Sequence, residues 1–132
     1  MNISSISKLL SKLNIARQCH FISLKISLNN INLRLLEKFY ELGVIRGYNV
    51  RVNENCIKVF FKYTIGGKGF VIKFSQVSTN GKRVYVDLIG LLKLKELSSN
   101  TIYLLSTDVG FLFDYECIMQ KKGGEVIIKI VM

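Results

Sequence analysis

The sequence contains few of the residues that build metal centres and disulfide frameworks. Its three cysteines, Cys19, Cys56 and Cys117, are odd in number, widely separated and without CxxC spacing. Such a set supports neither a disulfide framework nor a zinc site, and it fits a reducing compartment. We therefore expect no metal and no cofactor.

Catalytic groups are also scarce, because the chain has one histidine and nine scattered acidic residues. Cys19 and His20 are a nucleophile and a base, but adjacent residues rarely present both groups to one substrate. No carboxylate is placed by pattern to orient the histidine. A small nuclease is a disfavoured alternative, and we expect no enzyme, no catalytic residue and no small-molecule substrate.

Long apolar runs and targeting signals are absent too. No apolar run approaches the roughly 18 residues that a membrane-spanning helix needs, so we expect no membrane partner. The first residues lack both a secretory hydrophobic region and the arginine-rich bias of a transit peptide. Proline and tryptophan are missing, while Ile, Lys, Leu and Asn are abundant, as in the product of an A+T-rich genome such as an organelle's. A protein of that kind would be made inside the organelle.

Basic residues, in contrast, are in large excess. Nineteen Lys and Arg oppose nine Asp and Glu, which gives a net charge of +10 and a pI near 9.7. So large an excess on 132 residues points to a polyanionic partner, with nucleic acid favoured over an anionic membrane surface. The 49% of hydrophobic residues suffices to bury the core of one domain or of two small ones.

Hydrophobic periodicity predicts an α+β fold of two small α/β units packed together. Residues 1–66 read as helix, strand, helix, strand, strand, and residues 67–132 read as mostly β with a short helix. The boundary is placed at the glycines of residues 66–69. The expected elements are a helix over 4–18, a strand over 21–26, a helix from Asn29 or Asn30 to Leu42 with Gly43 as its stop, strands over 44–52 and 57–61, a strand over 70–77, a turn over 78–82, extended chain over 83–86 and a short helix or turn over 88–97.

The sequence pattern of the last third of the chain predicts the element order strand, loop, helix, loop, strand. An apolar run ends in Ser106, Thr107 and Gly110, and a loop of such small donors can approach a nucleic-acid backbone closely. The same pattern also occurs in an ordinary turn. Gly123 and Gly124 precede the final strand of residues 126–131 and would let backbone amides approach RNA, although they could equally be a helix stop.

A second group of candidate residues surrounds the Asn80-Gly81 turn. Lys82 and Arg83 can neutralise phosphates, and Tyr85 offers a ring for stacking or a hydroxyl for hydrogen bonding. A solvated turn and a core tyrosine are the alternatives. Glu125 could accept a hydrogen bond from a base amino group or orient its own loop.

Three motifs in order carry a resemblance to a known family. They are Ser78-Thr79-Asn80-Gly81-Lys82-Arg83-Val84-Tyr85, Leu104-Leu105-Ser106-Thr107-Asp108-Val109-Gly110 and Gly123-Gly124-Glu125-Val126. Over nearly its whole length the chain resembles the bacterial-type S8 family of small-subunit ribosomal proteins. Asp108 departs from the family's serine and would repel a phosphate at close range by about 1 kcal/mol or more.

The resemblance implies a structural constituent of the small ribosomal subunit that binds small-subunit ribosomal RNA directly and supports its folding and assembly. It implies neighbouring small-subunit proteins as further partners. The expected RNA-binding residues are Ser78, Lys82, Arg83, Tyr85, Ser106, Thr107, Gly123, Gly124 and Glu125. The resemblance and the composition together indicate a mitochondrial ribosome, with a plastid or an A+T-rich bacterium as alternatives. A regulatory nucleic-acid-binding protein outside the ribosome is the alternative function.

Overall fold

The computed structural model describes residues 3–63, 73–97 and 100–132. The chain divides into two compact units, Met1–Val71 and Ile72–Met132. The predicted boundary between residues 66 and 67, with its glycines, lies outside the described residues.

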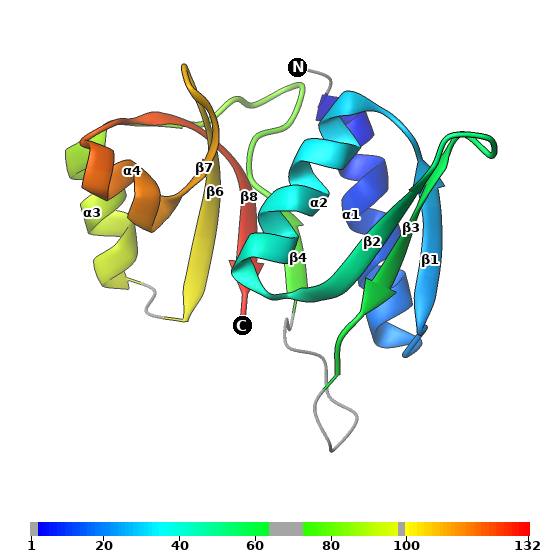
Figure 1. The fold of residues 1–132 in the computed structure, drawn as a ribbon. Helices are drawn as coiled ribbons and strands as arrows, with labels where there is room; N and C mark the ends of the chain where they lie inside the picture. Colours follow the sequence, from blue (N-terminus) through cyan, green and yellow to red (C-terminus); the bar gives the residue numbers. More distant parts are fainter. Residues whose placement is uncertain (1–2, 64–72, 98–99) are drawn as a thin grey trace. The chain divides into compact units, whose positions relative to one another are not determined.

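The first unit contains two helices and a three-stranded antiparallel sheet. Its elements follow the predicted order, and the sheet has the strand order β1-β3-β2. Both helices cover one face of this sheet (Figure 1). The elements are α1 (Ile3–Gln18), β1 (Ser23–Ser27), α2 (Asn30–Leu42), β2 (Ile45–Arg51) and β3 (Cys56–Phe61).

The ends of α2 are set by the two residues that the sequence predicts. The backbone N–H of Asn32 donates to the side chain of Asn29 at 2.8 Å, which satisfies one of the free donors of the first turn. At the other end Gly43 adopts a left-handed φ of 85°, a conformation that costs glycine little. The predicted bounds of this helix are therefore confirmed.

The alternating pattern of β3 separates a buried face from an open one. Ile57 and Val59 are fully buried beneath the helices, whereas Lys58 and Phe60 lie between them in sequence and are half-buried. Because successive strand residues point to opposite faces, Lys58 and Phe60 lie on the face that α1 and α2 leave uncovered.

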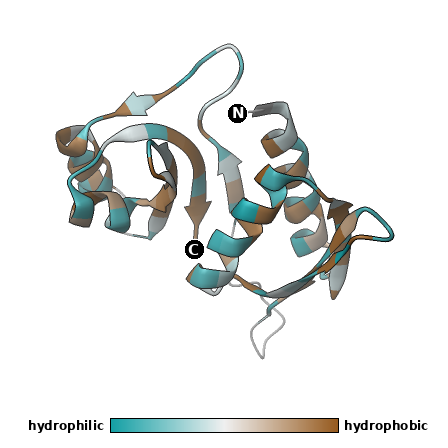
Figure 2. Ribbon diagram, turned by 45° about the horizontal axis from the view of Figure 1, so that its top comes forward, coloured by the Kyte–Doolittle hydropathy of each residue, from teal (hydrophilic) through white to brown (hydrophobic). Residues whose placement is uncertain are grey.

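The second unit is a five-stranded antiparallel sheet with two helices. Strand β8 is central, because it pairs with β4 and β5 along one edge and with β6 along the other, while β7 pairs with β6. The residues of β8 are mostly hydrophobic towards the C-terminus (Figure 2). The elements are β4 (Lys73–Gln76), β5 (Tyr85–Val86), α3 (Leu88–Leu97), β6 (Thr101–Thr107), β7 (Gly110–Phe113), α4 (Asp114–Gln120) and β8 (Gly124–Val131).

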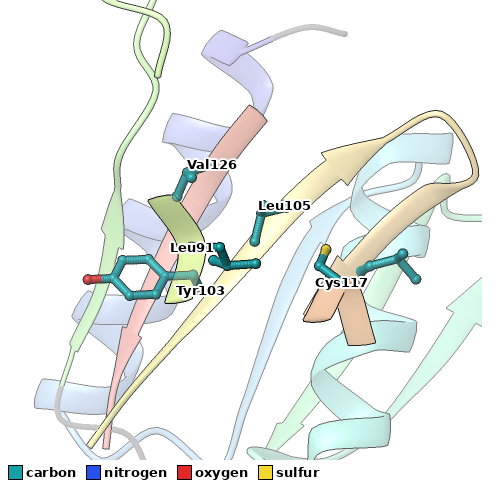
Figure 3. Packing of buried hydrophobic residues seen from close by; sticks show 6 residues of the cluster. Leu91, Tyr103, Leu105, Cys117 and Val126 are labelled. Atoms are coloured by element: carbon teal, nitrogen blue, oxygen red, sulfur yellow. The ribbon is translucent and has the colours of Figure 1, made fainter. Parts of the chain in front are cut away.

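Side chains from both helices and three strands form the core of this unit (Figure 3). Leu91 of α3 and Cys117 of α4 are fully buried against Leu105 and Val126 of the sheet, and Tyr103 and Leu112 complete the cluster. The Lys95 Nζ of α3 also lies 3.0 Å from the buried Asp114 Oδ2 at the start of α4. Apolar packing and one ion pair thus fix both helices.

The α+β class is confirmed, but the last third differs from its predicted order. Ser106 and Thr107 end strand β6 and do not form a loop, because they pair with Phe111 and Gly110 in a hairpin. Strand β7 therefore precedes α4, which spans seven residues. A four-residue strand held by pairing with its neighbour carries little periodic signal of its own.

Candidate nucleic-acid interface

Three adjacent strands bring the predicted site residues together at one edge of the second unit. In the register of the sheet Glu125 of β8 lies opposite Tyr85 of β5 and opposite Ser106 of β6. A hollow of about 490 Å³ opens there, and we call it the Ser106 pocket. Its lining residues are Tyr85, Ser106, Thr107, Asp108, Lys122, Gly123, Gly124 and Glu125.

Six of the nine residues predicted for RNA binding line this pocket. The exceptions, Ser78, Lys82 and Arg83, belong to the segment that leads into β5. Asp108 and Lys122 were not among the predicted residues but also line it. The sequence motifs thus identify most of the residues that line the pocket, although the three motifs lie far apart along the chain.

Gly123 and Gly124 are needed for the close packing of neighbouring backbone. A Cβ atom on Gly123 would overlap the carbonyl oxygen of Val86, and one on Gly124 would lie 2.5 Å from the carbonyl oxygen of Ser106. Neither contact is possible without a backbone shift. The double glycine therefore lets β8 enter the sheet between β5 and β6, and this packing forms the floor of the pocket.

Glu125 is held inside the site by Arg83. The carboxylate side chain is 6% exposed and accepts hydrogen bonds from Nε and from Nη2 of Arg83, the latter at 3.0 Å. This hydrogen bonding lowers the pKa of Glu125 and raises the pKa of Arg83. Of the two roles considered for Glu125, orienting its own surroundings agrees with this geometry.

Ser78 is a buried residue that stabilises the site through hydrogen bonds. It is fully buried, its hydroxyl donates to the carbonyl oxygen of Val126 at 2.6 Å, and it accepts from the N–H of Val84 at 3.0 Å. Ser78 therefore ties the segment before β5 to strand β8, and its hydroxyl is not exposed to a ligand. The adjoining turn is closed by two hydrogen bonds between Thr79 and Lys82.

The two hydroxyls at the end of β6 differ in their availability. Thr107 Oγ1 donates to the carbonyl oxygen of Gly110 at 2.8 Å and accepts from the N–H of Val109 at 3.3 Å, so it stabilises the hairpin turn. Among the residues described, none pairs with the hydroxyl of Ser106. Ser106 is the hydroxyl that a ligand in the pocket can reach.

Asp108 and Lys122 form an ion pair at the rim of the pocket. Nζ of Lys122 lies 3.1 Å from Oδ1 of Asp108, and the side chains are 32% and 77% exposed. A pair this exposed contributes little to stability. It does hold the ammonium of Lys122 next to the carboxylate of Asp108, so each charge partly offsets the other at the rim.

Tyr85 and Lys82 extend the exposed part of the site. Tyr85 is 69% exposed, which excludes the alternative of a core tyrosine. Lys82 is exposed in the turn before β5. The hollow is therefore lined by a hydroxyl, an aromatic ring and the cation of Lys122, and Lys82 lies in the segment that leads into β5.

Within the described parts of the chain, no three His, Cys, Asp or Glu residues gather as metal ligands would. None of the helices described there is long and apolar enough to span a membrane.

Comparisons with known proteins identify the family of the chain. The family profile of ribosomal protein S8 matches residues 4–131. The chain is 30% identical over 128 residues to small ribosomal subunit protein uS8m of Acanthamoeba castellanii, covering 97% of this chain and 99% of that protein. It is 30% identical to uS8 of Rickettsia typhi, covering 96% of each chain, and 28% identical to uS8 of Syntrophus aciditrophicus, covering 95% of each. The chain therefore belongs to the ribosomal protein S8 family, whose members are structural proteins of the ribosome and not enzymes.

Proposed function

We propose that the chain is a structural constituent of the small ribosomal subunit and binds small-subunit ribosomal RNA directly through the Ser106 pocket. The observation that carries the proposal is the gathering of Ser106, Tyr85 and Lys122 around one hollow. A free hydroxyl can bond a ribose or a base edge, a ring can stack, and an ammonium can approach a phosphate. The net charge of +10 supports attraction to RNA over the whole surface.

The remaining predicted residues take indirect roles in this proposal. Ser78, Arg83 and Glu125 hold β5 and β8 in place, Thr107 closes the hairpin, and the two glycines form the floor. Lys82, for which no ion pair is found among the described residues, can meet a phosphate from the turn before β5. By folding RNA around such a fixed edge, the protein would support assembly of the subunit together with neighbouring small-subunit proteins.

Binding of the full chain to a fragment of small-subunit ribosomal RNA tests the proposal. Ser106→Ala should weaken binding by about 1 kcal/mol, roughly fivefold, because one hydrogen bond is lost. Its salt dependence should not change, because no charge is removed. Ser11→Ala, which removes a serine of α1 whose hydroxyl bonds the carbonyl oxygen of Ser7, is the matched control and should bind like the wild type. Equal affinity of Ser106→Ala and wild type would contradict the role of the pocket.

Co-sedimentation separates the ribosomal role from a regulatory one. A structural constituent should stay with purified small subunits through a wash of high salt. A regulator that uses the same surface on other RNA would be released under these conditions.

We also propose that the ribosome in question is mitochondrial. The composition typical of an A+T-rich genome and the uS8m relative support this location, whereas bacterial relatives of similar identity keep a plastid or an A+T-rich bacterium as alternatives. Fractionation of the source cells, with an antibody against the chain, distinguishes them.

A further inference from the structure

The open face of the first unit's sheet carries a second group of residues suited to RNA. Phe60 lies in the middle strand of this sheet, and its partner across to β2 is Gly47. Since glycine has no side chain, the pairing leaves the ring of Phe60 uncovered on that side. A hollow of about 350 Å³ lies there, lined by Arg46, Gly47, Tyr48 and Phe60.

A β-bulge directs a cation to this hollow. The register of β2 against β3 shifts between Ile45 and Gly47, which pair with Phe61 and Phe60, so Arg46 is the extra residue. Bulges of this kind turn a side chain out of the regular alternation. Arg46 is exposed at the rim, and no ion pair is found for it among the described residues.

A second cation already contacts the ring. Nζ of Lys58 lies 5.4 Å from the centroid of Phe60, a distance at which an ammonium is attracted to the face of an aromatic ring. Lys58 and Phe60 are two residues apart on the same strand and therefore share the open face. The half-buried ring of Phe60 is thus flanked by two positive side chains.

The charge of the whole unit agrees with an anionic ligand. Residues 1–71 contain eleven Lys and Arg against three acidic residues, whereas residues 72–132 contain eight against six. Most of the excess positive charge therefore lies in the unit that does not contain the Ser106 pocket. Lys25 and Arg51 of the sheet share one carboxylate, that of Glu54, at 3.1 Å and 3.5 Å. Among the described residues no ion pair is found for the other two cations of the sheet, Arg46 and Lys58.

We propose that the hollow at Phe60 binds single-stranded RNA, with one unpaired base stacked on the Phe60 ring and the adjoining phosphates bound by Arg46 and Lys58. Stacking on a strand-borne aromatic ring requires an unpaired base, because the faces of paired bases are covered in a helix. The chemistry is tolerant of sequence, since every base has a face to stack. This site is separate from the Ser106 pocket and does not depend on it.

Binding of an unstructured RNA hexamer that contains 2-aminopurine tests this site in the full chain. Stacking quenches the fluorescence of this base, and anisotropy of an end label reports affinity. Phe60→Leu should weaken binding about tenfold and abolish the quenching, with no change in salt dependence. Phe60→Tyr should keep both properties, which shows that the ring is required and that the strand tolerates substitution.

Charge variants separate this site from general attraction. Arg46→Gln should lower the salt slope by about 0.7, as expected for one lost phosphate contact with a single strand. Arg34→Gln, which removes an exposed arginine of α2, is the matched control and should leave the slope nearly unchanged. The loss of ribosomal RNA affinity caused by Ser106→Ala should be the same with and without Phe60→Leu, so failure of this site is distinguishable from failure of the ribosomal RNA site. Wild-type affinity and quenching in Phe60→Leu, or equal slopes in the two arginine variants, would overturn the proposal.

Discussion

At the scale of single residues, two carboxylates decide how much positive charge the Ser106 pocket offers. Glu125 is buried and paired with Arg83, and Asp108 is exposed and paired with Lys122. The first pair belongs to the framework of the site, because removing either partner leaves a charge without its counterion in a partly buried place. The second pair lies at the rim, where a phosphate can compete with Asp108 for the lysine.

We predict that Asp108→Ser tightens binding to small-subunit ribosomal RNA. The substitution removes one negative charge and frees Lys122, so the gain should be several-fold at low salt and smaller at high salt, where screening weakens both effects. Lys122→Gln should weaken binding and lower the salt slope by about one unit. The double variant provides the control, because without Lys122 the gain from Asp108→Ser should shrink.

Weaker binding in Asp108→Ser would contradict this account. It would mean that the carboxylate itself contacts RNA, for example by accepting from a base amino group.

The Arg83–Glu125 pair predicts a pH dependence of stability. Because the pKa of Glu125 is lowered in the folded protein, its carboxylate stabilises the fold above the ordinary glutamate pKa. This stabilisation is lost as the pH falls through the lowered pKa. Glu125→Gln should therefore cost about 1 kcal/mol at neutral pH, a value discounted for the partial exposure of Arg83.

Urea unfolding of the wild type and of Glu125→Gln between pH 7 and pH 3 measures this effect. The difference in the free energy of unfolding should be constant near neutrality and should shrink below about pH 4. A difference that stays the same down to pH 3 would show that Glu125 is not stabilised as a carboxylate.

At the scale of elements, the site depends on how closely β8 approaches its neighbours. Gly124→Ala places a methyl group 2.5 Å from the carbonyl oxygen of Ser106, so β6 and β8 must separate. We expect a loss of stability of roughly 2 kcal/mol, in the range of overpacked interiors, with weaker RNA binding. Gly81→Ala, where an added Cβ meets nothing within 4 Å, is the control. Thermal unfolding and RNA affinity are measured for both variants. A Gly124→Ala protein with the stability and the RNA affinity of the wild type would refute the role of Gly124 in close packing.

Elements with strong local signals could be predicted from the sequence. Helix α2 has an amphipathic pattern, an Asn cap and a glycine stop, and the structure shows both of its ends at the predicted residues. Strand β7 was missed because its four residues are fixed by pairing with β6, which is a tertiary interaction. For the same reason Ser106 and Thr107 were expected in a loop.

The candidate site was predictable by residue type but not by role. Motifs identified Ser106, Tyr85 and the glycines, which meet in the pocket. Sequence alone could not show that Arg83 pairs with Glu125, 42 residues away, or that Ser78 is buried. Lys122 was not predicted, because its pairing with Asp108 spans 14 residues and is a tertiary contact.

At the scale of the whole molecule, positive charge and recognition motifs are divided between the units. The first unit has the greater charge excess and the second has the Ser106 pocket. We therefore predict that a fragment of residues 72–132 retains specific affinity for small-subunit ribosomal RNA. A fragment of residues 1–71 should bind RNA of any sequence with strong salt dependence.

Circular dichroism must first show that each fragment folds, after which competition with unrelated RNA measures specificity. Specific recognition of this RNA by residues 1–71 alone would contradict the assignment of the main binding site to the second unit.

A cryo-electron microscopy map of small ribosomal subunits from the source organism tests the central claim most directly. We predict density for the chain in the subunit, with Tyr85, Ser106 and Lys122 against ribosomal RNA. Absence of the chain from salt-washed subunits, or a Ser106 pocket that faces solvent, would contradict the account.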